Sequence, residues 1–138
     1  MRPITTILFC ILTVSLSAQT WTQIGSDIDG EDAYDESGLS ISLSSDGSVV
    51  AIGARYNDGN GTDAGHVRVY QNASGTWTQI GSDIDGEDAY DYFGYSVSLS
   101  SDGNTVAIGA PFNDGNGTYA GHVRVYNLCT TDLSTDTI

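Results

Sequence analysis

The sequence predicts an all-β protein built from two tandem copies of one antiparallel unit. Residues 21–70 align without a gap with residues 77–126, at a spacing of 56, and 9 of the 50 aligned positions differ. Within each copy, apolar residues alternate with small residues in a period of two, and an Asp-Gly pair separates two such runs. No segment after residue 18 has helical spacing. Close copies of this kind indicate two copies of one structural unit.

Each copy carries four strand signals. In the second copy, residues 95–100 alternate apolar with serine, and residues 106–109 continue the alternation after a turn. Residues 122–126 and 77–80 are the third and fourth strands, copied from residues 66–70 and 21–24. The Asp46-Gly47 and Asp102-Gly103 pairs predict type I′ hairpin turns, in which both central residues take positive φ.

The residues opposite the large apolar ones favour a propeller-type architecture. That face carries Ser, Ala and Gly instead of long charged side chains, which suits a sheet packed closely on both faces. We therefore expect tandem four-stranded antiparallel blades of β-propeller type, with a two-sheet sandwich as the alternative. Because propellers need at least ~4 blades, the two blades are expected to be part of a larger propeller, in a longer chain or in an oligomer. Residues 21–24 would then complete the last sheet.

The two ends of the chain differ from the repeats, and the first of them indicates export. Residues 1–18 have the layout of a secretory signal peptide: Arg2, an apolar run to Leu16, and small residues up to Ala18. Removal of this segment predicts a secreted or cell-surface protein beginning at Gln19, with no membrane insertion. Residues 127–138 leave the repeat and indicate the start of a further module, in which Cys129 has no partner within the mature chain.

The charge balance excludes two classes of partner. The chain has 18 Asp and Glu against 4 Lys and Arg, and a formal net charge of −14. Such a surface repels nucleic acids and anionic membranes, so neither is expected as a partner. It attracts divalent cations and basic surfaces, and it also keeps an exported protein in solution.

The residues of the second hairpin resemble a known family. Phe93-Gly94, then Gly109-Ala110-Pro111 and GHVRVY, resemble the FG-GAP repeat, the blade unit of integrin α-subunit propellers and of many exported bacterial proteins. The resemblance implies an exported, bacterial surface protein. The resemblance implies a seven-bladed propeller with roles in adhesion and ligand binding. The first copy departs from the motif, with Ser37-Gly38 and Gly53-Ala54-Arg55. Residues 19–126 are thus expected to hold two FG-GAP-like repeats, at 21–76 and 77–126.

Calcium is the candidate cofactor, in a different loop from the one that the resemblance implies. The family often has a calcium loop between FG and GAP, but here Asp102 is the only acid in that interval, and calcium prefers 6–8 oxygens. Asp46 and Asp102 are therefore interpreted as turn residues. Acids that alternate before a glycine form a second cluster in each copy. The candidate ligands are Asp27, Asp29, Asp32, Asp35, Asp83, Asp85, Asp88 and Asp91. The alternative is an Asp/Gly-rich turn that leads to the next sheet.

No motif indicates an enzyme. The sequence has no nucleophile elbow, zinc spacing or phosphate loop. Nearly every polar residue occurs twice, whereas an active site brings different residues together once. His66 and His122 are interpreted as hydrogen-bonding residues at strand ends. We expect a non-catalytic module that binds an extracellular protein or glycan through its end loops. The alternatives are a structural spacer in a large surface protein and a non-catalytic part of a larger exported enzyme.

Overall fold

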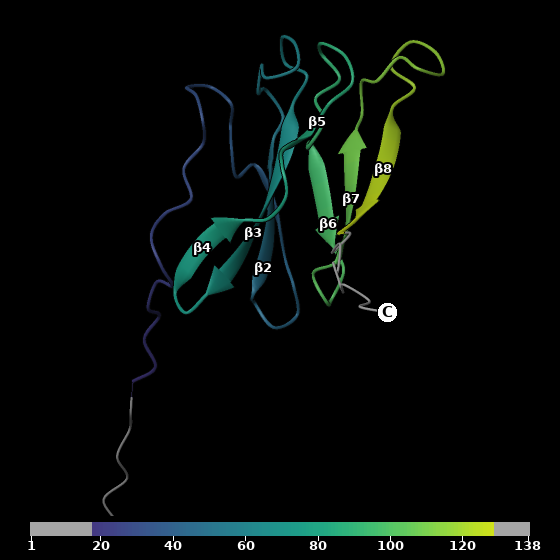
Figure 1. The fold of residues 1–138 in the computed structure, drawn as a ribbon. Helices are drawn as coiled ribbons and strands as arrows, with labels where there is room; N and C mark the ends of the chain where they lie inside the picture. The colour runs from purple at the N-terminus through teal and green to yellow at the C-terminus, as the bar shows by residue number, and fades with distance from the viewer. Residues whose placement is uncertain (1–17, 129–138) are drawn as a thin grey trace, which may run out of the picture.

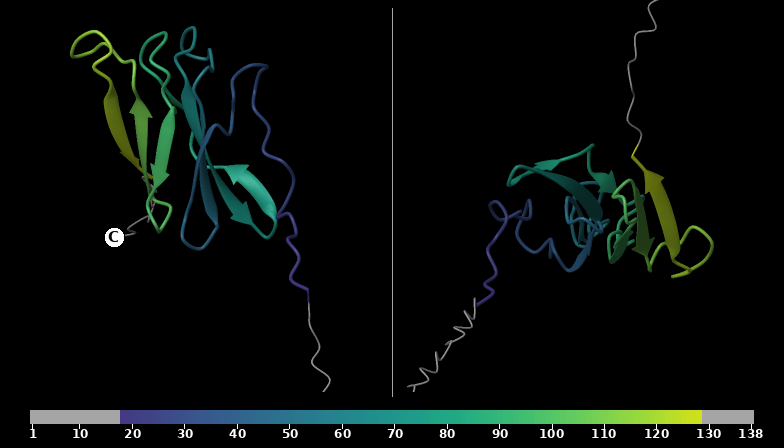
Figure 2. Two further views of the ribbon diagram at one scale, coloured as in Figure 1. Left: turned by 180° about the vertical axis from the view of Figure 1, so that it is seen from behind. Right: turned by 90° about the horizontal axis from the view of Figure 1, so that it is seen from below.

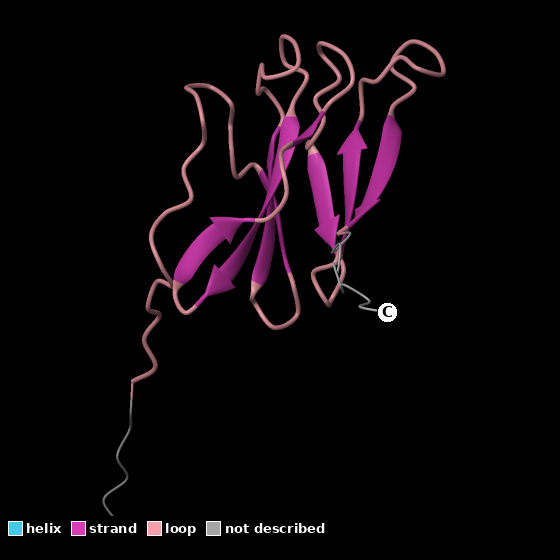
Figure 3. Ribbon diagram, viewed as in Figure 1, coloured by secondary structure: helices cyan, strands magenta, loops and turns pink. Residues whose placement is uncertain are grey.

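The computed structural model describes residues 18–128, which form β-strands and loops without a helix (Figures 1 and 3). Residues 1–17 of the predicted signal peptide and residues 129–138 of the predicted tail, with Cys129, lie outside the described residues. In the part that is described, no helix is long and apolar enough to cross a membrane. The prediction of an all-β fold is confirmed for this part.

The first sheet has five antiparallel strands. They are β1 (Ser40–Leu43), β2 (Val49–Ala54), β3 (His66–Ala73), β4 (Thr76–Gln79) and β5 (Ile84–Asp85). The order is β1-β2-β3-β4, and β5 pairs with the start of β3. Because β4 pairs with the end of β3, strands β4 and β5 together line one edge of β3. Residues 80–83 connect β4 to β5. The outer strand predicted at 77–80 is confirmed, and its continuation in β5 was not predicted.

The second sheet repeats the first three strands. It consists of β6 (Ser96–Leu99), β7 (Thr105–Ala110) and β8 (His122–Asn127), in the order β6-β7-β8. The registers are equivalent, since Ser40 pairs with Gly53 in the first sheet and Ser96 with Gly109 in the second. The strand predictions from alternation hold in both copies, which the shared sequence pattern explains.

The prediction of a strand at residues 21–24 is wrong. Residues 18–24 form no strand, and Trp21 is fully exposed. This segment lies beside the β3–β4 hairpin, where the Trp77 indole N–H donates to the Ile24 carbonyl at 2.9 Å. It therefore does not complete the second sheet, whose β8 edge pairs with no strand among residues 18–128.

The two Asp-Gly turns form, but they are not of type I′. Gly47 has a φ of 74° and Gly103 a φ of 76°, whereas neither aspartate has positive φ. The N–H of Gly47 donates to the Ser44 carbonyl at 3.0 Å, which closes a four-residue turn with the glycine last. Each aspartate side chain instead accepts hydrogen bonds within its own turn. The prediction that Asp46 and Asp102 are turn residues is confirmed.

The two sheets lie side by side (Figure 2). They pack through unlike faces. The first sheet contributes its small-residue face, in which Ser40, Ser42, Ala51 and Gly53 neighbour Val67 and Val69. The second sheet contributes its bulky face, formed by Val97, Leu99, Val106 and Ile108. Ala51, Val67, Val106 and Ile108 belong to the buried core, together with Phe93. A side chain on Gly53 would collide with the backbone of Gly94, so glycine is required for the sheets to approach.

This packing differs from that of a two-sheet sandwich. The backbone N–H of Ser45 donates at 3.0 Å to the carbonyl of Ser101, its own counterpart in the other copy. The small-residue face of the first sheet also meets the bulky face of the second, so the second sheet repeats the orientation of the first. A sandwich turns its two apolar faces toward each other and its polar faces outward. Here apolar residues remain on both outer faces, which is consistent with successive propeller blades.

Candidate functional site

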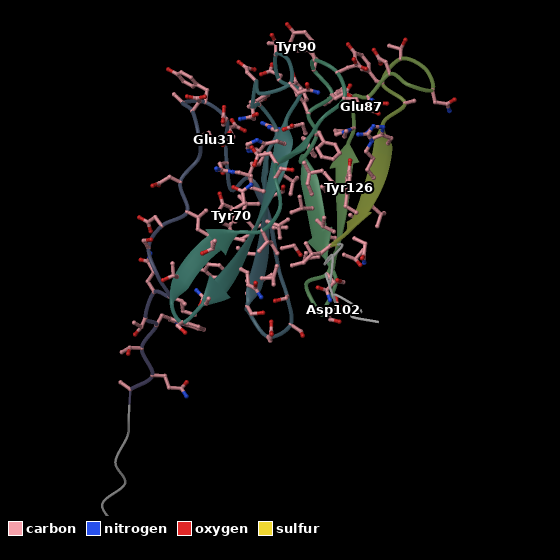
Figure 4. The ribbon with its side chains drawn as sticks, in the orientation of Figure 1. Glu31, Tyr70, Glu87, Tyr90, Asp102 and Tyr126 are labelled. Carbon is pink, nitrogen blue, oxygen red and sulfur yellow. The ribbon has the colours of Figure 1, made fainter. Side chains whose placement is uncertain are left out.

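Four loops gather at one end of the two sheets, the upper end in Figure 1. They comprise residues 25–39, 55–65, 86–95 and 111–121. The two Asp-Gly turns lie at the opposite end, where Figure 4 shows Asp102 far from Tyr90. The loop end carries two hollows, one in each copy, and the rigid sheets below hold them in place.

The first hollow has a volume of about 760 Å³. Residues of the 31–35 and 56–59 segments line it, with Asp63 and Tyr92. The second hollow measures about 500 Å³ and is lined by Asp88, Ala89, Tyr90, Asp91, Phe112, Asp114, Gly115 and Tyr119. Each of these eight residues is the counterpart, 56 positions later, of a residue in the first hollow. The molecule therefore presents the same type of hollow twice. A third hollow of about 230 Å³, lined mainly by apolar side chains, lies between the sheets toward the other end.

A buried carboxylate–amide pair adjoins each hollow, and its carboxylate lines the hollow. The Asn57 side-chain amide donates to Asp35 Oδ2 at 2.8 Å, and the Asn113 amide donates to Asp91 Oδ2 at 2.7 Å. All four side chains are buried. The carbonyl oxygen of each asparagine side chain accepts the backbone N–H two residues later, so each pair ties one loop to the next. A buried charge is tolerated because it is hydrogen-bonded.

Aromatic rings form a row across the loop end. Tyr56, Tyr92, Phe112 and Tyr119 follow one another edge to face, with ring centroids 5.2, 5.1 and 5.5 Å apart. This geometry is favoured by the ring quadrupoles. Burial raises the pKa of the Tyr92 hydroxyl, and the Asp63 carboxylate raises it further. The row joins the two hollows into one surface of aromatic faces and acids.

One tyrosine in each hollow is exposed and has strained backbone. Tyr34 has a φ of 75° and is 92 % exposed, while Tyr90 has a φ of 68° and is 58 % exposed. Left-handed backbone costs a residue other than glycine about 1–3 kcal/mol where the surroundings impose it. An exposed ring contributes little core packing to offset that cost. Strain of this kind is concentrated at functional sites.

An ion cluster lies below the first hollow. The His66 imidazole is almost completely buried, and its Nδ1 lies 3.8 Å from Glu31 Oε2 and 4.0 Å from Asp83 Oδ2. Arg68 Nη1 lies 3.5 Å from Glu31 Oε1, and Nη2 donates to the Asp29 carbonyl at 2.8 Å. The cluster thus fastens the incoming loop to β3. The second copy repeats part of it, with His122 Nδ1 3.8 Å from Glu87 and Arg124 against the same carboxylate.

The same cluster is where the described residues come nearest to a metal site. One ligand atom from each of Glu31, His66 and Asp83 lies within 4.8 Å of the other two. The Arg68 guanidinium beside Glu31 already supplies positive charge there, which opposes a cation. Of the eight predicted calcium ligands, Asp83 alone belongs to this group.

The other predicted ligands are distributed along the loops. Asp32, Asp35, Asp88 and Asp91 line the two hollows. Asp27 accepts a hydrogen bond from Gln23 at 2.8 Å, the carbonyl of Asp29 accepts one from Arg68, and Asp85 lies in β5 opposite His66. The structure therefore brings half of the set to the two hollows, as two separate pairs. Calcium binding by these acids stays a prediction.

The interval between FG and GAP does not fit a calcium ion. Asp102 Oδ1 accepts the Ser100 hydroxyl at 2.6 Å and the Asn104 backbone N–H at 3.0 Å. These hydrogen bonds, that of Ser100 first, lower the pKa of the Asp102 carboxyl. The carboxylate is thus used inside its own turn, and the described residues offer no second acid in this interval.

A family comparison identifies the second copy. Residues 82–126 match the family model described as the FG-GAP repeat. This segment is an FG-GAP repeat. The match begins before β5 and ends within β8, so the FG-GAP repeat contains the second hollow and all of the second sheet except its last residue. No curated protein matches the chain.

Phe93, the first residue of the Phe-Gly pair of the FG-GAP repeat, belongs to the core between the sheets. Phe93 is completely buried between the sheets, and its ring lies edge to face with His122 and Tyr126 at 6.4 and 6.5 Å. Its backbone N–H donates to the Ala64 carbonyl at 2.9 Å. In the first copy Ser37 stands at this position, and no further sheet of the described residues packs against it.

Sequence reasoning missed the ion clusters and the aromatic row. The sequence indicates that His66 lies at a strand end, and the fold also places Glu31 and Asp83 beside it. A signal was present, because the pairs Glu31/His66 and Glu87/His122 recur with the same separation of 35 residues. Because the two copies are nearly identical, many other residue pairs also recur with equal separation. The spacing alone therefore does not distinguish the Glu/His pairs from the rest.

Proposed function

We propose that the chain is a secreted or cell-surface propeller-type module that binds an extracellular protein or glycan through its loop end. The observation that carries this proposal is the pair of equivalent hollows, each with an exposed tyrosine held in left-handed backbone. Binding surfaces of this type combine concave shape, aromatic side chains and a few polar groups. The assignment to the FG-GAP family supports a propeller module, and adhesion or ligand binding is our proposal.

The chemistry of the hollows favours a ligand rich in hydroxyl or cationic groups. Carboxylates accept hydrogen bonds from sugar hydroxyls and pair with basic side chains. Exposed tyrosine rings offer a large contact area at low conformational entropy cost. Two hollows on one rigid frame allow bivalent engagement, which raises the overall affinity without a new type of contact.

The proposed role is non-catalytic. Polar residues of the two hollows come in equivalent pairs, and such duplication suits repeated contacts with a repetitive or extended ligand. Calcium is the cofactor we propose to test, since Asp32, Asp35, Asp88 and Asp91 line the two hollows.

The direct test is binding of the chain from Gln19 onward to arrays of glycans and extracellular matrix proteins, with and without calcium. Tyr34→Ala and Tyr90→Ala should each weaken binding, and the double variant should reduce it to background. Trp21→Ala removes another exposed aromatic outside the hollows and serves as the matched control. If no immobilised ligand binds at any calcium concentration, the repeats act as a spacer and the proposal fails.

A further inference from the structure

The two outward faces are equivalent to the two faces that meet in the interface between the sheets. The first sheet uses its small-residue face internally, and the equivalent face of the second sheet points outward. Likewise the second sheet uses its bulky face internally, and that of the first points outward. We infer that a second copy of this chain docks on these faces, head to tail, and repeats the internal interface between chains.

Burial of equivalent residues shows that the outward small-residue face is an uncovered copy of the buried one. Val67 is completely buried against the second sheet, whereas its counterpart Val123 is 68 % exposed. Ala64 is completely buried, and Ala120 is exposed. Val125, the counterpart of the half-buried Val69, is 66 % exposed. The residues that the second sheet covers on the first sheet are therefore exposed at the equivalent positions of the second sheet.

The β1 part of the bulky face of the first sheet has the same relation to the interface, whereas Ile52, Arg68 and Tyr70 on that face are already buried. Ile41 is 67 % exposed and Leu43 is 57 % exposed, while their counterparts Val97 and Leu99 pack against the core. Large apolar residues that gather on one surface mark an interaction site. In the internal interface the bulky face is covered by the small-residue face of the other repeat. We therefore expect the small-residue face of another copy to cover the outward bulky face.

The polar contacts across the internal interface can also be repeated. Ser40 Oγ donates to the Gly94 carbonyl at 2.6 Å, and Ser42 Oγ accepts the Leu99 N–H at 2.9 Å. On the outward side, Ser96 and Ser98 are exposed at the positions equivalent to these serines. On the facing side, Gly38 and Leu43 are the equivalents of Gly94 and Leu99. Both partners of each hydrogen bond are therefore present on a second copy.

The interface joins two different surfaces, so it is heterologous. Such contacts build a ring if the rotation between copies closes and a filament if it does not. Each chain carries a large excess of acid, so copies repel one another, and we expect association to strengthen as salt screens that repulsion.

One difference makes the joint between chains weaker than the internal one. Phe93 fills the internal interface, but its counterpart on the outward bulky face is Ser37. Ser37→Phe restores the missing ring and should tighten association by about tenfold or more, the effect of burying one phenylalanine side chain.

The test is sedimentation of the chain from Gln19 onward over a range of concentrations and salt. The wild type should associate beyond a dimer. Val123→Glu blocks the small-residue face and Ile41→Glu blocks the bulky face, so each variant alone should be monomeric. A mixture of the two should form a dimer and nothing larger, because each variant retains the face that the other lacks. Thr22→Glu adds the same charge at an exposed position outside both faces and should change nothing.

Three results would overturn the inference. They are a wild type that stays monomeric at every concentration and salt level, a Val123→Glu variant that still forms dimers, and a mixture of the two blocked variants that does not associate. Circular dichroism of each variant checks that its sheets are intact. Ser37→Phe should strengthen association, and adding Val123→Glu to it should abolish that association, whereas non-specific aggregation would continue. The sheet faces are separate from the loop-end hollows, so failure here leaves the ligand-binding proposal standing.

Discussion

Residues 21–35 and 77–91 have the same fifteen amino acids but different structures. In the second segment, Trp77 to Gln79 belong to β4 and Ile84 and Asp85 form β5, both paired with β3. In the first segment no residue forms a strand. The difference is the neighbour, because the second segment follows β3 directly and pairs with its edge, whereas the first segment follows no described strand and does not pair with the free edge of β8. Strand structure here is decided by the available partner, in agreement with the context dependence of β propensity.

Several substitutions test this contrast between the copies. The largest effect is expected from Phe93→Ser, which gives the second copy the residue of the first. Removal of a fully buried ring should lower the free energy of unfolding by about 3–5 kcal/mol. Urea denaturation followed by circular dichroism measures the change. Ser37→Ala, the control in the first copy, should change stability by less than about 0.5 kcal/mol. A loss from Phe93→Ser that is no larger than that of the control would contradict the interface.

The second effect concerns the carboxylate–amide pairs. Asp91→Ala leaves the buried Asn113 amide without its acceptor and should cost about 2–3 kcal/mol. Asp35→Ala should cost less, because Glu31 Oε2 already lies 3.4 Å from the Asn57 amide and remains as an acceptor. Thermal unfolding of the two variants gives the comparison. An equal or larger loss for Asp35→Ala would show that Glu31 does not compensate.

A smaller effect separates the two tryptophans of the identical segments. Trp77 is half-buried in β4 and donates to the Ile24 carbonyl, so Trp77→Ala should cost about 1–2 kcal/mol. Trp21 is fully exposed, and Trp21→Ala should change stability by less than about 0.5 kcal/mol. Urea unfolding measured by circular dichroism avoids the change in fluorescence. If Trp21→Ala were as costly as Trp77→Ala, the two segments would have the same structure after all.

The smallest effect is the pH dependence of the Asp-Gly turns. The Ser48 backbone N–H, followed by the Ser44 and Ser48 hydroxyls, lowers the pKa of Asp46 from 3.8 to about 2. A lowered pKa in the folded state means that the charged turn stabilises the protein above about pH 4, and that this stabilisation is lost as the pH falls toward about 2. The difference in melting temperature between the wild type and Asp46→Asn should therefore shrink across this window. A difference that stays constant down to about pH 2 would contradict the lowered pKa.

Local sequence predicted the hairpins well. Alternation of Val97 and Leu99 with serines gave β6, and Asp102-Gly103 gave its turn, since both signals are complete within a few residues. The turn type was wrong, because the Asp102 side chain accepts the Asn104 backbone N–H and the φ of Asp102 is not positive. The extra strand β5 was missed because two residues carry no periodicity.

The site was less predictable than the fold. Acidic residues at Asp32 and Asp88 suggested the right loops, since the loops of repeat units are where ligands bind. The hollows themselves depend on residues brought together across 22 positions, as in Asp35 with Asn57. Such contacts depend on how the loops pack on the folded sheets, and no local sequence pattern predicts them. The aromatic row also crosses from one copy to the other, which a repeat unit considered alone cannot show.

The first sheet is completed by strands β4 and β5, of which all but Thr76 belong to the second sequence copy. Each join between copies is thus made by a shared sheet as well as by the backbone. A recombination event that adds 56 codons at any point in such an array restores every residue to an equivalent neighbour, whatever the breakpoint. A chain lengthened by whole repeats therefore keeps its sheets intact.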